Sequence, residues 1–231
     1  MRIAGKGLIN REKTVNFKFD GRSYKGFEGD TVASALLASG KKIFGRSFKY
    51  HRPRGVLTAG SEEPNALITV GQGAFQDPNI RATTQEIFEG LITKSQNNWP
   101  NLQYDILSIN DLFSNFLGAG FYYKTFMWPK SFWEKIYEPF IRRAAGLGAL
   151  SGLHNSDTYE KAYAFCDLLI IGGGPSGLMA AKIAAKAGLD VILAEQEPIF
   201  GGRLNSETEK VDGIPGSDWA AKIIEELKAL D

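Results

Sequence analysis

The stretch Gly172-Gly173-Gly174-Pro175-Ser176-Gly177 fits the pattern G-x-G-x-x-G, in which a glycine-rich turn joins a strand to a helix. The apolar residues 167–171 precede it and predict a strand, and residues 175–186 have the composition of a helix that Gly188 ends. A second strand is expected at residues 190–195. Strand, glycine turn, helix and strand in this order predict the start of an α/β, Rossmann-like domain.

Each glycine of this motif has a steric reason. Gly172 permits a tight turn, Gly174 lets backbone N–H groups approach a pyrophosphate, and Gly177 lets the helix lie close to the strand. The N-terminus of the helix adds its dipole and its unpaired N–H donors. The expected dinucleotide-binding residues are therefore Gly172, Gly173, Gly174, Pro175, Ser176 and Gly177. The alternative is a glycine-rich turn that binds no ligand.

An acidic residue, Glu195, ends the second expected strand 18 positions after Gly177, near the spacing at which an acid binds an adenosine ribose. Its carboxylate would repel a 2′-phosphate, which favours NAD or FAD over NADP. A glycine pair, Gly201-Gly202, follows the strand, as is common in flavoproteins with two dinucleotide sites. The expected cofactor-binding residues therefore also include Gly202, Arg203 and Leu204, although a surface role for Arg203 fits equally well. These residues leave the choice between NAD and FAD open.

Residues 1–90 have the pattern of a small α+β domain. Apolar and polar residues alternate over 15–19 as in a half-buried strand, and Asp20-Gly21 is a favoured hairpin turn. A helix that Asp30 or Thr31 caps follows. Further strands are expected at residues 66–70 and 80–84. A hairpin, a helix and two later strands predict a β-grasp domain.

Residues 91–160 differ in composition and are interpreted as a helical connector. Residues 99–140 hold 13 of the chain's 27 aromatic side chains, which indicates either a core packed between domains or a subunit interface. Residues 161–231 supply the two Rossmann strands and a final helix that Ser217 would cap. Because a parallel sheet needs more strands than two, this Rossmann-like domain is expected to be incomplete.

Composition excludes several classes of protein. The single cysteine, Cys166, excludes a disulfide framework, a cysteine-rich zinc site and a cysteine-ligated cluster. No signal peptide and no apolar run of the roughly 20 residues that a membrane helix needs is present, so a cytoplasmic protein is expected. The two histidines, His51 and His154, lack metal-ligand spacing. No catalytic residue and no metal ligand is therefore expected.

Charge is distributed unevenly along the chain. Residues 1–57 carry a net charge of +9, and residues 58–231 carry −8. The basic loop of residues 41–55 interleaves cations with aromatic side chains, a pattern that can bind nucleic acid. Docking onto the acidic remainder or onto a partner subunit fits better, because no nucleic-acid recognition motif surrounds the loop; a solvated face is the third interpretation. No nucleic-acid partner is expected.

Several motifs together resemble one family. They are SFKYHRPRG at residues 47–55, EPNAL at 63–67, GFYYKTFMWP at 120–129, YEP at 137–139 and AAGLG at 144–148. Throughout the chain the sequence is similar to the alpha subunit of heterotetrameric sarcosine oxidases. This resemblance implies NAD at the glycine motif and Glu195, FAD and FMN elsewhere in the complex, and beta, gamma and delta subunits as partners. It also implies oxidative demethylation of sarcosine to glycine, hydrogen peroxide and a one-carbon unit that can pass to tetrahydrofolate.

The first domain also resembles the [2Fe–2S] ferredoxin domain of related amine dehydrogenases. The plant-type cysteine spacing falls on Thr58, Glu63, Ala66 and Thr83. Since none is cysteine, a cluster-free ferredoxin-like domain without an iron–sulfur cluster is expected. The family's alpha subunit is several times longer, so this chain alone is expected to be inactive, either a truncated subunit or a natural remnant. The alternatives are a non-catalytic assembly module and an FAD-binding subunit of a related amine dehydrogenase.

Overall fold

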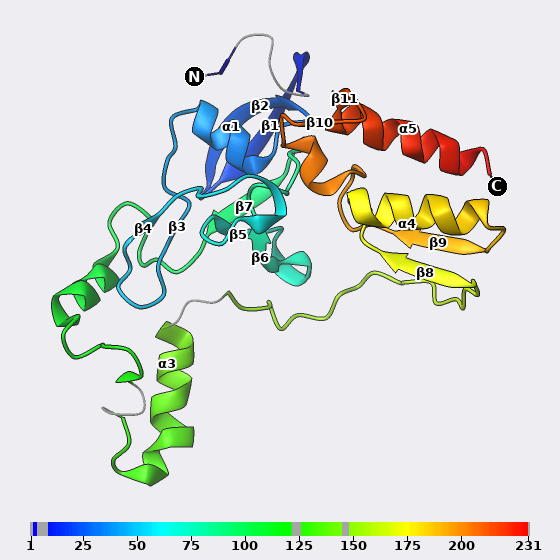
Figure 1. Cartoon of the computed structure of the whole chain (residues 1–231). Coiled ribbons are helices and arrows are strands. Elements are labelled where there is room, and N and C mark those ends of the chain that lie inside the picture. Colours follow the sequence, from blue (N-terminus) through cyan, green and yellow to red (C-terminus); the bar gives the residue numbers. More distant parts are fainter. Residues whose placement is uncertain (1, 4–8, 122–125, 145–147, 231) are drawn as a thin grey trace. The chain divides into compact units, whose positions relative to one another are not determined.

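The computed structural model describes residues 2–3, 9–121, 126–144 and 148–230. It divides into two compact units (Figure 1). Unit 1 comprises Met1–Thr58 and Glu62–Ser156, and unit 2 comprises Ala59–Ser61 and Asp157–Asp231. Each unit has its own cluster of buried apolar side chains. Among the described residues, no helix has the length and apolar composition that crossing a membrane requires.

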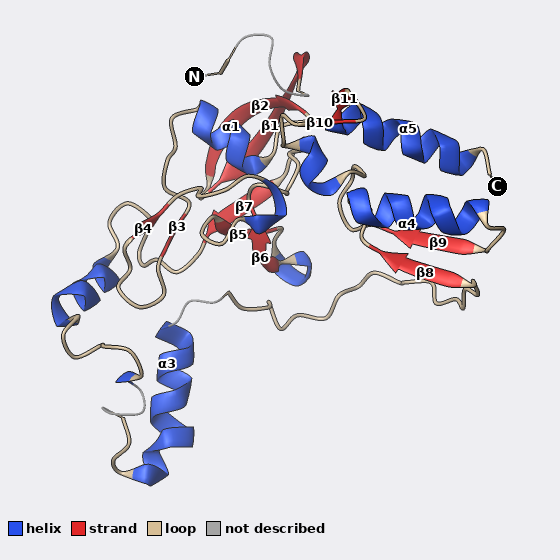
Figure 2. Cartoon of the chain, in the orientation of Figure 1, coloured by secondary structure: helices blue, strands red, loops and turns tan. Residues whose placement is uncertain are grey.

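Unit 1 is built on a five-stranded mixed sheet in the order β2-β1-β7-β5-β6. Its strands are β1 (Asn10–Phe19), β2 (Arg22–Glu28), β5 (Leu67–Val70), β6 (Asp77–Arg81) and β7 (Ile92–Ser95). β1 and β7 run parallel, and the β1–β2, β5–β6 and β5–β7 pairs are antiparallel. The short helix α1 (Val32–Ala38) packs against β2 (Figure 2). This strand order with one packed helix agrees with the predicted β-grasp domain.

Local signals in the sequence account for the first hairpin and for α1. Asp20 and Gly21 both have positive φ, 50° and 75°, as the two-residue turn requires. Thr31 is the residue that caps α1, because its Oγ1 accepts a hydrogen bond from Ser34 N at 3.2 Å. Asp30 is buried instead and accepts two hydrogen bonds from Arg2, at 2.6 and 2.7 Å. Phe17, Phe19, Leu36, Phe44 and Ile68 are among the side chains that fill the core.

Three boundaries differ from the sequence-based expectations. β7 begins at Ile92 and pairs with both β1 and β5, so the sheet continues past the expected domain end at residue 90. β6 covers Asp77–Arg81 instead of 80–84. Residues 82–84 leave the sheet in a turn, in which Thr84 N donates to Arg81 O at 3.1 Å. The pattern of a strand with only four or five residues, such as β7 or β6, gives too few alternations to fix its ends.

The segment after β7 is only partly helical. It contains the 3-10 helices η3 (Ile106–Phe113) and η4 (Lys130–Phe132), the short π-helix η5 (Trp133–Tyr137) and the α-helix α3 (Glu138–Ala144). The described range 148–166 contains neither helix nor strand. Exposed aromatic side chains of this segment are Trp99, Tyr104, Phe113, Phe116, Trp128, Phe132 and Phe140, whereas Tyr122 and Tyr123 lie outside the described residues. Other rings of the segment pack together, since Phe126 lies 5.9 Å from Phe121 and 5.3 Å from Tyr137 between ring centroids. The choice between a packed core and a subunit interface stays a prediction.

Unit 2 consists mainly of two helices and a two-stranded parallel sheet. β8 (Leu168–Ile171) pairs with β9 (Val191–Ala194), and α4 (Pro175–Lys186) packs on the sheet. α4 also packs against α5 (Gly216–Lys228), and Leu178 meets Trp219 and Ile223 in their shared core. The predicted cap at Ser217 is wrong, because α5 begins at Gly216 after Pro215, with no side-chain cap. The remaining elements are η6 (Gly202–Asn205), β10 (Lys210–Val211) and β11 (Ile214–Pro215) in unit 2, and η1 (Gly60–Glu62), η2 (Gly73–Phe75), β3 (Gly45–Arg46) and β4 (Pro53–Arg54) elsewhere.

In unit 1, the buried carboxylate of Glu63 organises the backbone of residues 57–58 and 63–66. Glu63 Oε2 accepts hydrogen bonds from Leu57 N and Thr58 N, both at 2.7 Å. Its Oε1 accepts from Asn65 N at 2.7 Å and Ala66 N at 3.0 Å. Burial raises the pKa of this carboxyl, but the four N–H donors outweigh that effect and hold the pKa below its ordinary value. Glu63 is therefore a buried anion that holds its own loop.

We predict that Glu63→Gln lowers the free energy of unfolding by about 2 kcal/mol at pH 7, because an amide puts a donor where backbone donors converge. Since folding lowers the pKa of Glu63, the carboxylate stabilises the fold above its ordinary pKa of 4.5, and this contribution falls as pH drops through the folded-state pKa. Urea unfolding from pH 3 to 7 should show the gap between wild type and variant closing at acidic pH. Glu12→Gln, at an exposed position of β1, is the control. Equal stability of the Glu63→Gln variant and wild type at pH 7 would contradict the prediction.

Candidate functional site

The glycine-rich loop lies at the carboxyl edge of the parallel strands. Ile171, the last residue of β8, pairs with Ala194 of β9, and Gly172 N donates to Ala194 O at 2.8 Å. Gly172 has φ +102°, a conformation that L side chains rarely adopt, and it turns the chain from the strand toward α4. Pro175 starts this 12-residue helix, with Gly174 as its N-cap. The N-terminus of α4 thus opens where ligands bind in open α/β sheets.

Two glycines of the motif meet opposite steric conditions. A Cβ at Gly177 would lie 1.9 Å from the carbonyl oxygen of Gly172, so no other residue fits at this contact between loop and helix. A Cβ at Gly174 would meet no described atom within 4 Å. Gly177 is therefore needed for the fold of the loop itself, whereas the space at Gly174 is available to a ligand.

The predicted acidic residue reaches the glycine loop directly. Glu195 Oε2 accepts a hydrogen bond from Gly173 N at 2.6 Å, and Oε1 accepts from Gln196 N at 2.7 Å and Glu197 N at 3.0 Å. Burial raises the pKa of the Glu195 carboxyl, but these three N–H donors outweigh it and lower the pKa below its ordinary value. A carboxylate that is ionised at neutral pH is thus held against the loop.

The second glycine pair lies against the first loop. Gly201 N donates to Gly173 O at 2.8 Å, and a Cβ at Gly202 would approach Gly174 Cα to 3.3 Å. The sequence does not predict a role for Phe200. A Cβ placed at Gly173 would lie only 2.3 Å from Cδ1 of the Phe200 ring, so this ring fills the space beside Gly173. The only sequence signal for Phe200 is its place directly before the glycine pair. The two loops therefore form one continuous backbone surface.

In this structure, Arg203 and Leu204 contact other residues of unit 2. Arg203 Nε donates to Glu207 Oε1 at 2.8 Å. Leu204 is buried in the core of unit 2 with Leu178 and Trp219, so its role in this structure is packing. Pro175 and Ser176 are exposed in the first turn of α4, where backbone N–H groups have no acceptor within the helix.

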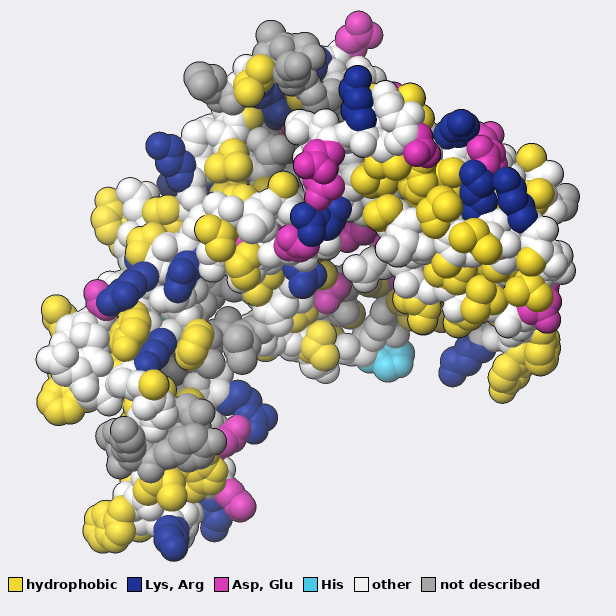
Figure 3. Space-filling view, in the orientation of Figure 1, with side chains coloured by type: hydrophobic (Ala, Val, Ile, Leu, Met, Phe, Trp, Pro, Cys, Tyr) yellow, Lys and Arg dark blue, Asp and Glu magenta, His cyan; other side chains and the backbone are white. Residues whose placement is uncertain are grey.

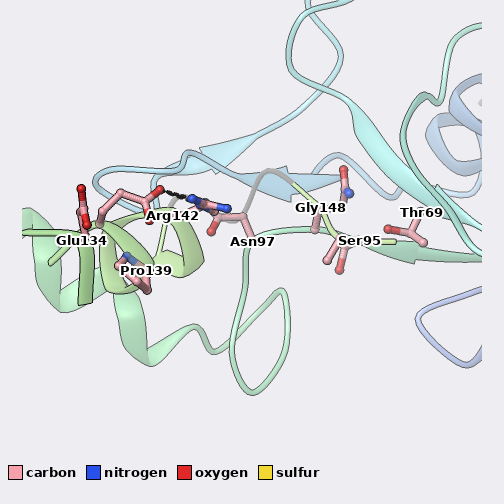
Figure 4. Close-up of a pocket in the computed structure, with 10 residues that line it drawn as sticks. Thr69, Ser95, Asn97, Glu134, Pro139, Arg142 and Gly148 are labelled. Atoms are coloured by element: carbon pink, nitrogen blue, oxygen red, sulfur yellow. Dashed lines mark hydrogen bonds and ion pairs between the residues drawn. The ribbon is translucent and has the colours of Figure 1, made fainter. Parts of the chain in front are cut away.

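Unit 1 contains a separate cavity of about 790 Å³ between the ends of β5 and β7 and the helical segment that ends in α3 (Figure 4). Ser95, Asn97 and Glu134 contribute polar groups to it. Its arginine, Arg142, already pairs with Glu138 at 2.7 Å, as the dashed line in Figure 4 marks. None of the expected cofactor-binding residues lines this cavity, so the glycine loop of unit 2 remains the candidate site.

The four positions that match a plant-type cluster spacing lie in unit 1. Glu63 is the buried anion described above, and Ala66 is buried in the hydrophobic core. Thr58 donates its backbone N–H to Glu63 at 2.7 Å. Thr83 lies in the turn that follows β6. The loop thus directs backbone N–H groups inward, toward a carboxylate.

Two family models match the chain. Residues 12–98 match a 2Fe-2S iron-sulfur cluster binding domain. Residues 167–228 match the FAD dependent oxidoreductase family. These ranges cover the β-grasp sheet of unit 1 and the glycine loop of unit 2, so the expected succession of a ferredoxin-like domain and a dinucleotide-type domain is supported at the level of the family.

The match of residues 12–98 corrects one expectation. The prediction of a chain without an iron–sulfur cluster is contradicted, because this range matches a family model described as a 2Fe-2S iron-sulfur cluster binding domain. The prediction relied on the lack of cysteine at Thr58, Glu63, Ala66 and Thr83. Clusters of this type are held by cysteine thiolates, and the sole cysteine of the sequence, Cys166, lies outside the matched range. The residues within the match do not fit the usual ligand set of such a cluster.

Known proteins resemble the chain along nearly its whole length. "Sarcosine oxidase subunit alpha" of Rhizobium meliloti is 56% identical over 99% of this chain and 23% of that protein. The protein of the same name from Corynebacterium sp. strain U-96 is 32% identical over 96% of this chain and 18% of its own length. A crystal structure of L-proline dehydrogenase from P. horikoshii has a TM-score of 0.49 and 18% identity, and covers 94% of this chain and 32% of that chain.

The chain spans about a fifth of the length of these curated relatives. The identity is nevertheless high and extends through both units, which excludes a likeness confined to the glycine motif. The chain is therefore a relative of the sarcosine oxidase alpha subunits along nearly its whole length, as its sequence motifs predict.

Proposed function

We propose that unit 2 binds the adenosine and pyrophosphate part of a dinucleotide, with NAD as the first candidate, in a sarcosine-oxidising flavoenzyme. The observation that carries this proposal is the hydrogen bond of 2.6 Å between Glu195 and Gly173 N, which unites the acid and the glycine loop in one site. Parallel strands, a helix N-terminus and an ionised acid are the parts that such a site needs.

The residues have separate roles in this proposal. The N–H groups of the first turn of α4, at Ser176 and Gly177, would donate to the pyrophosphate, and the helix dipole would favour its charge. The space above Gly174 would admit the phosphate oxygens. Glu195 would accept the ribose hydroxyls and reject a 2′-phosphate by charge repulsion. Gly202 would complete the backbone surface at the second loop.

FAD is the second candidate, because residues 167–228 match the FAD dependent oxidoreductase family. Both dinucleotides contain the same adenosine and pyrophosphate group, so the residues named above would serve either. The bound dinucleotide, when it is NAD or FAD, supplies hydride chemistry that the protein only positions. Amine demethylation by the complete enzyme, with FAD and FMN in other parts and with beta, gamma and delta subunits, is part of this proposal.

The direct test is identification of the bound nucleotide. The protein is purified together with the subunits that assemble with it and is denatured, and the released nucleotides are identified by mass spectrometry. We expect NAD in a ratio near one per alpha subunit. A variant with Gly177→Ala should lose that nucleotide and retain the others. A complex that retains every nucleotide in this variant would overturn the assignment to unit 2.

The two motif glycines should respond differently to an added methyl group. Gly174→Ala should bind the dinucleotide at least about tenfold more weakly, equivalent to about 1.4 kcal/mol, with unchanged stability, because its Cβ enters only the ligand's space. Gly177→Ala should lose binding and stability together, since its Cβ collides with the Gly172 carbonyl. Calorimetric titration and urea unfolding measure these effects. Gly118→Ala, an open glycine in unit 1, is the control, and wild-type binding by the Gly174→Ala variant would count against the site.

Glu195 should set the preference against a 2′-phosphate. Glu195→Gln removes the negative charge, so the ratio of NADP to NAD dissociation constants should fall at least about tenfold. Because the pKa of Glu195 is lowered, its carboxylate stays ionised between pH 6 and 8 and does not itself make the wild-type ratio vary there. Fluorescence titration with both nucleotides measures the ratio. Asp190→Asn, before the opposite end of β9, should leave it unchanged; an unchanged ratio in the Glu195→Gln variant contradicts the assigned role.

A further inference from the structure

An exposed apolar surface lies on unit 1, outside the candidate site. It consists of side chains from η3 and the following turn, which we call the 106–116 surface: Ile106, Ile109, Leu112, Phe113 and Phe116. Leu112 is 81% exposed and Phe116 is 73% exposed. Single exposed apolar residues are ordinary, but a group of them on one short segment marks an interaction site.

A buried hydrogen bond between His51 and Asp105 fixes the start of this segment. Asp105 caps η3 and its Oδ2 lies 2.7 Å from His51 Nδ1, with both side chains buried. Asp105 Oδ1 accepts a hydrogen bond from Trp99 N at 2.9 Å. Arg46 donates to Leu102 O at 2.8 Å, which attaches the same segment to the short strand β3. The exposed side chains therefore project from a fixed support.

The basic loop holds the far end of the segment. Arg52 donates to Asp111 Oδ1 at 2.7 Å, and Tyr50 Oη donates to Leu117 O at 3.1 Å. The guanidinium carbon of Arg52 and Lys49 Nζ both lie over the Tyr50 ring, 4.8 and 5.0 Å from its centroid. A surface that is ordered before binding loses less conformational entropy when a partner docks. Because these contacts hold residues 106–117 in place, they favour a binding surface over a loosely packed end of the core.

Charge beside the surface indicates the chemistry of its partner. Residues 41–60 contain six Lys or Arg and no Asp or Glu. Figure 3 shows Lys and Arg side chains next to hydrophobic ones over this part of unit 1, at the left of the view. Protein interfaces combine an apolar centre with a polar rim, and opposite charges on the two rims speed association. A matching partner has an apolar centre and acidic residues around it.

We propose that the 106–116 surface, with Lys49 and Arg52 beside it, docks another protein subunit of the same oxidase through an apolar patch with an acidic rim. The proposal rests on the proposed function for the existence of such a complex. A protein partner fits better than nucleic acid because the centre of the surface is aliphatic and aromatic without cations. The relatives are named as one subunit of an enzyme, which supports a partner chain as the occupant.

Assembly of the full-length subunit with the other subunits of its complex provides the test. A double variant, Phe113→Glu with Phe116→Glu, should reduce the assembled fraction in native mass spectrometry at least tenfold. The matched control is Phe75→Glu with Phe88→Glu, because these phenylalanines are also exposed, at 54% and 56%, in another part of unit 1. The control should assemble as wild type. Normal assembly of the double variant at Phe113 and Phe116, or equal loss in the control, would overturn the proposal.

Three further measurements separate this proposal from its alternatives. The double variant at Phe113 and Phe116 should bind NAD or FAD as wild type does, so a failed dinucleotide assignment is recognised independently. Leu112→Cys should react with a maleimide in the isolated full-length subunit and be protected at least tenfold in the complex. Protection in the isolated subunit would mean that the same chain covers the surface, which overturns the proposal. A membrane surface is the other alternative. It would be identified if the protein bound phosphatidylglycerol vesicles while the introduced thiol of Leu112→Cys stayed unprotected in the complex, and this result would also overturn the proposal.

Discussion

The structure of unit 2 depends on one close contact, between the first turn of α4 and the carbonyl group of Gly172. A Cβ at Gly177 would lie 1.9 Å from that oxygen, so the helix can start this near the strand only because Gly177 has no side chain. The same approach puts the N-terminus of α4 at the carboxyl edge of β8 and β9, where Glu195 hydrogen-bonds Gly173 N. The steric constraint thus creates the electrostatic site: free N–H donors, the helix dipole and a fixed carboxylate converge there.

Unit 1 is organised by buried polar groups that fix its loops. Glu63 gathers four backbone N–H groups, and the pair of His51 with Asp105 joins the basic loop to η3. A buried carboxylate is costly unless its oxygens accept hydrogen bonds, and Glu63 accepts four. The hydrogen bond between His51 and Asp105 in turn holds the start of η3, which presents the apolar 106–116 surface.

Signals that act over a few residues can be predicted from the sequence, and signals that need the third dimension cannot. The Asp20-Gly21 turn, the Thr31 cap and the glycine loop follow from local backbone chemistry. The central position of β7 does not, because four residues carry little periodicity. Ser217 has the chemistry of a cap for α5, but a capping residue in a sequence does not fix where the helix begins. The position of Phe200 beside Gly173 depends on packing between separate segments. The lack of cysteine at the four plant-type positions does not predict the match of residues 12–98, whereas the resemblance to a ferredoxin domain does.

The central claim is that a dinucleotide binds at the backbone of the glycine loop. The most direct measurement is a titration of the isotope-labelled chain with NAD, and separately with FAD, followed by amide NMR signals. The account predicts saturable shifts at Gly173, Gly174, Ser176 and Gly177, with the signals of the β-grasp strands unchanged. Shifts confined to unit 1, or no shift of the loop amides at saturating concentrations of both nucleotides, would contradict it.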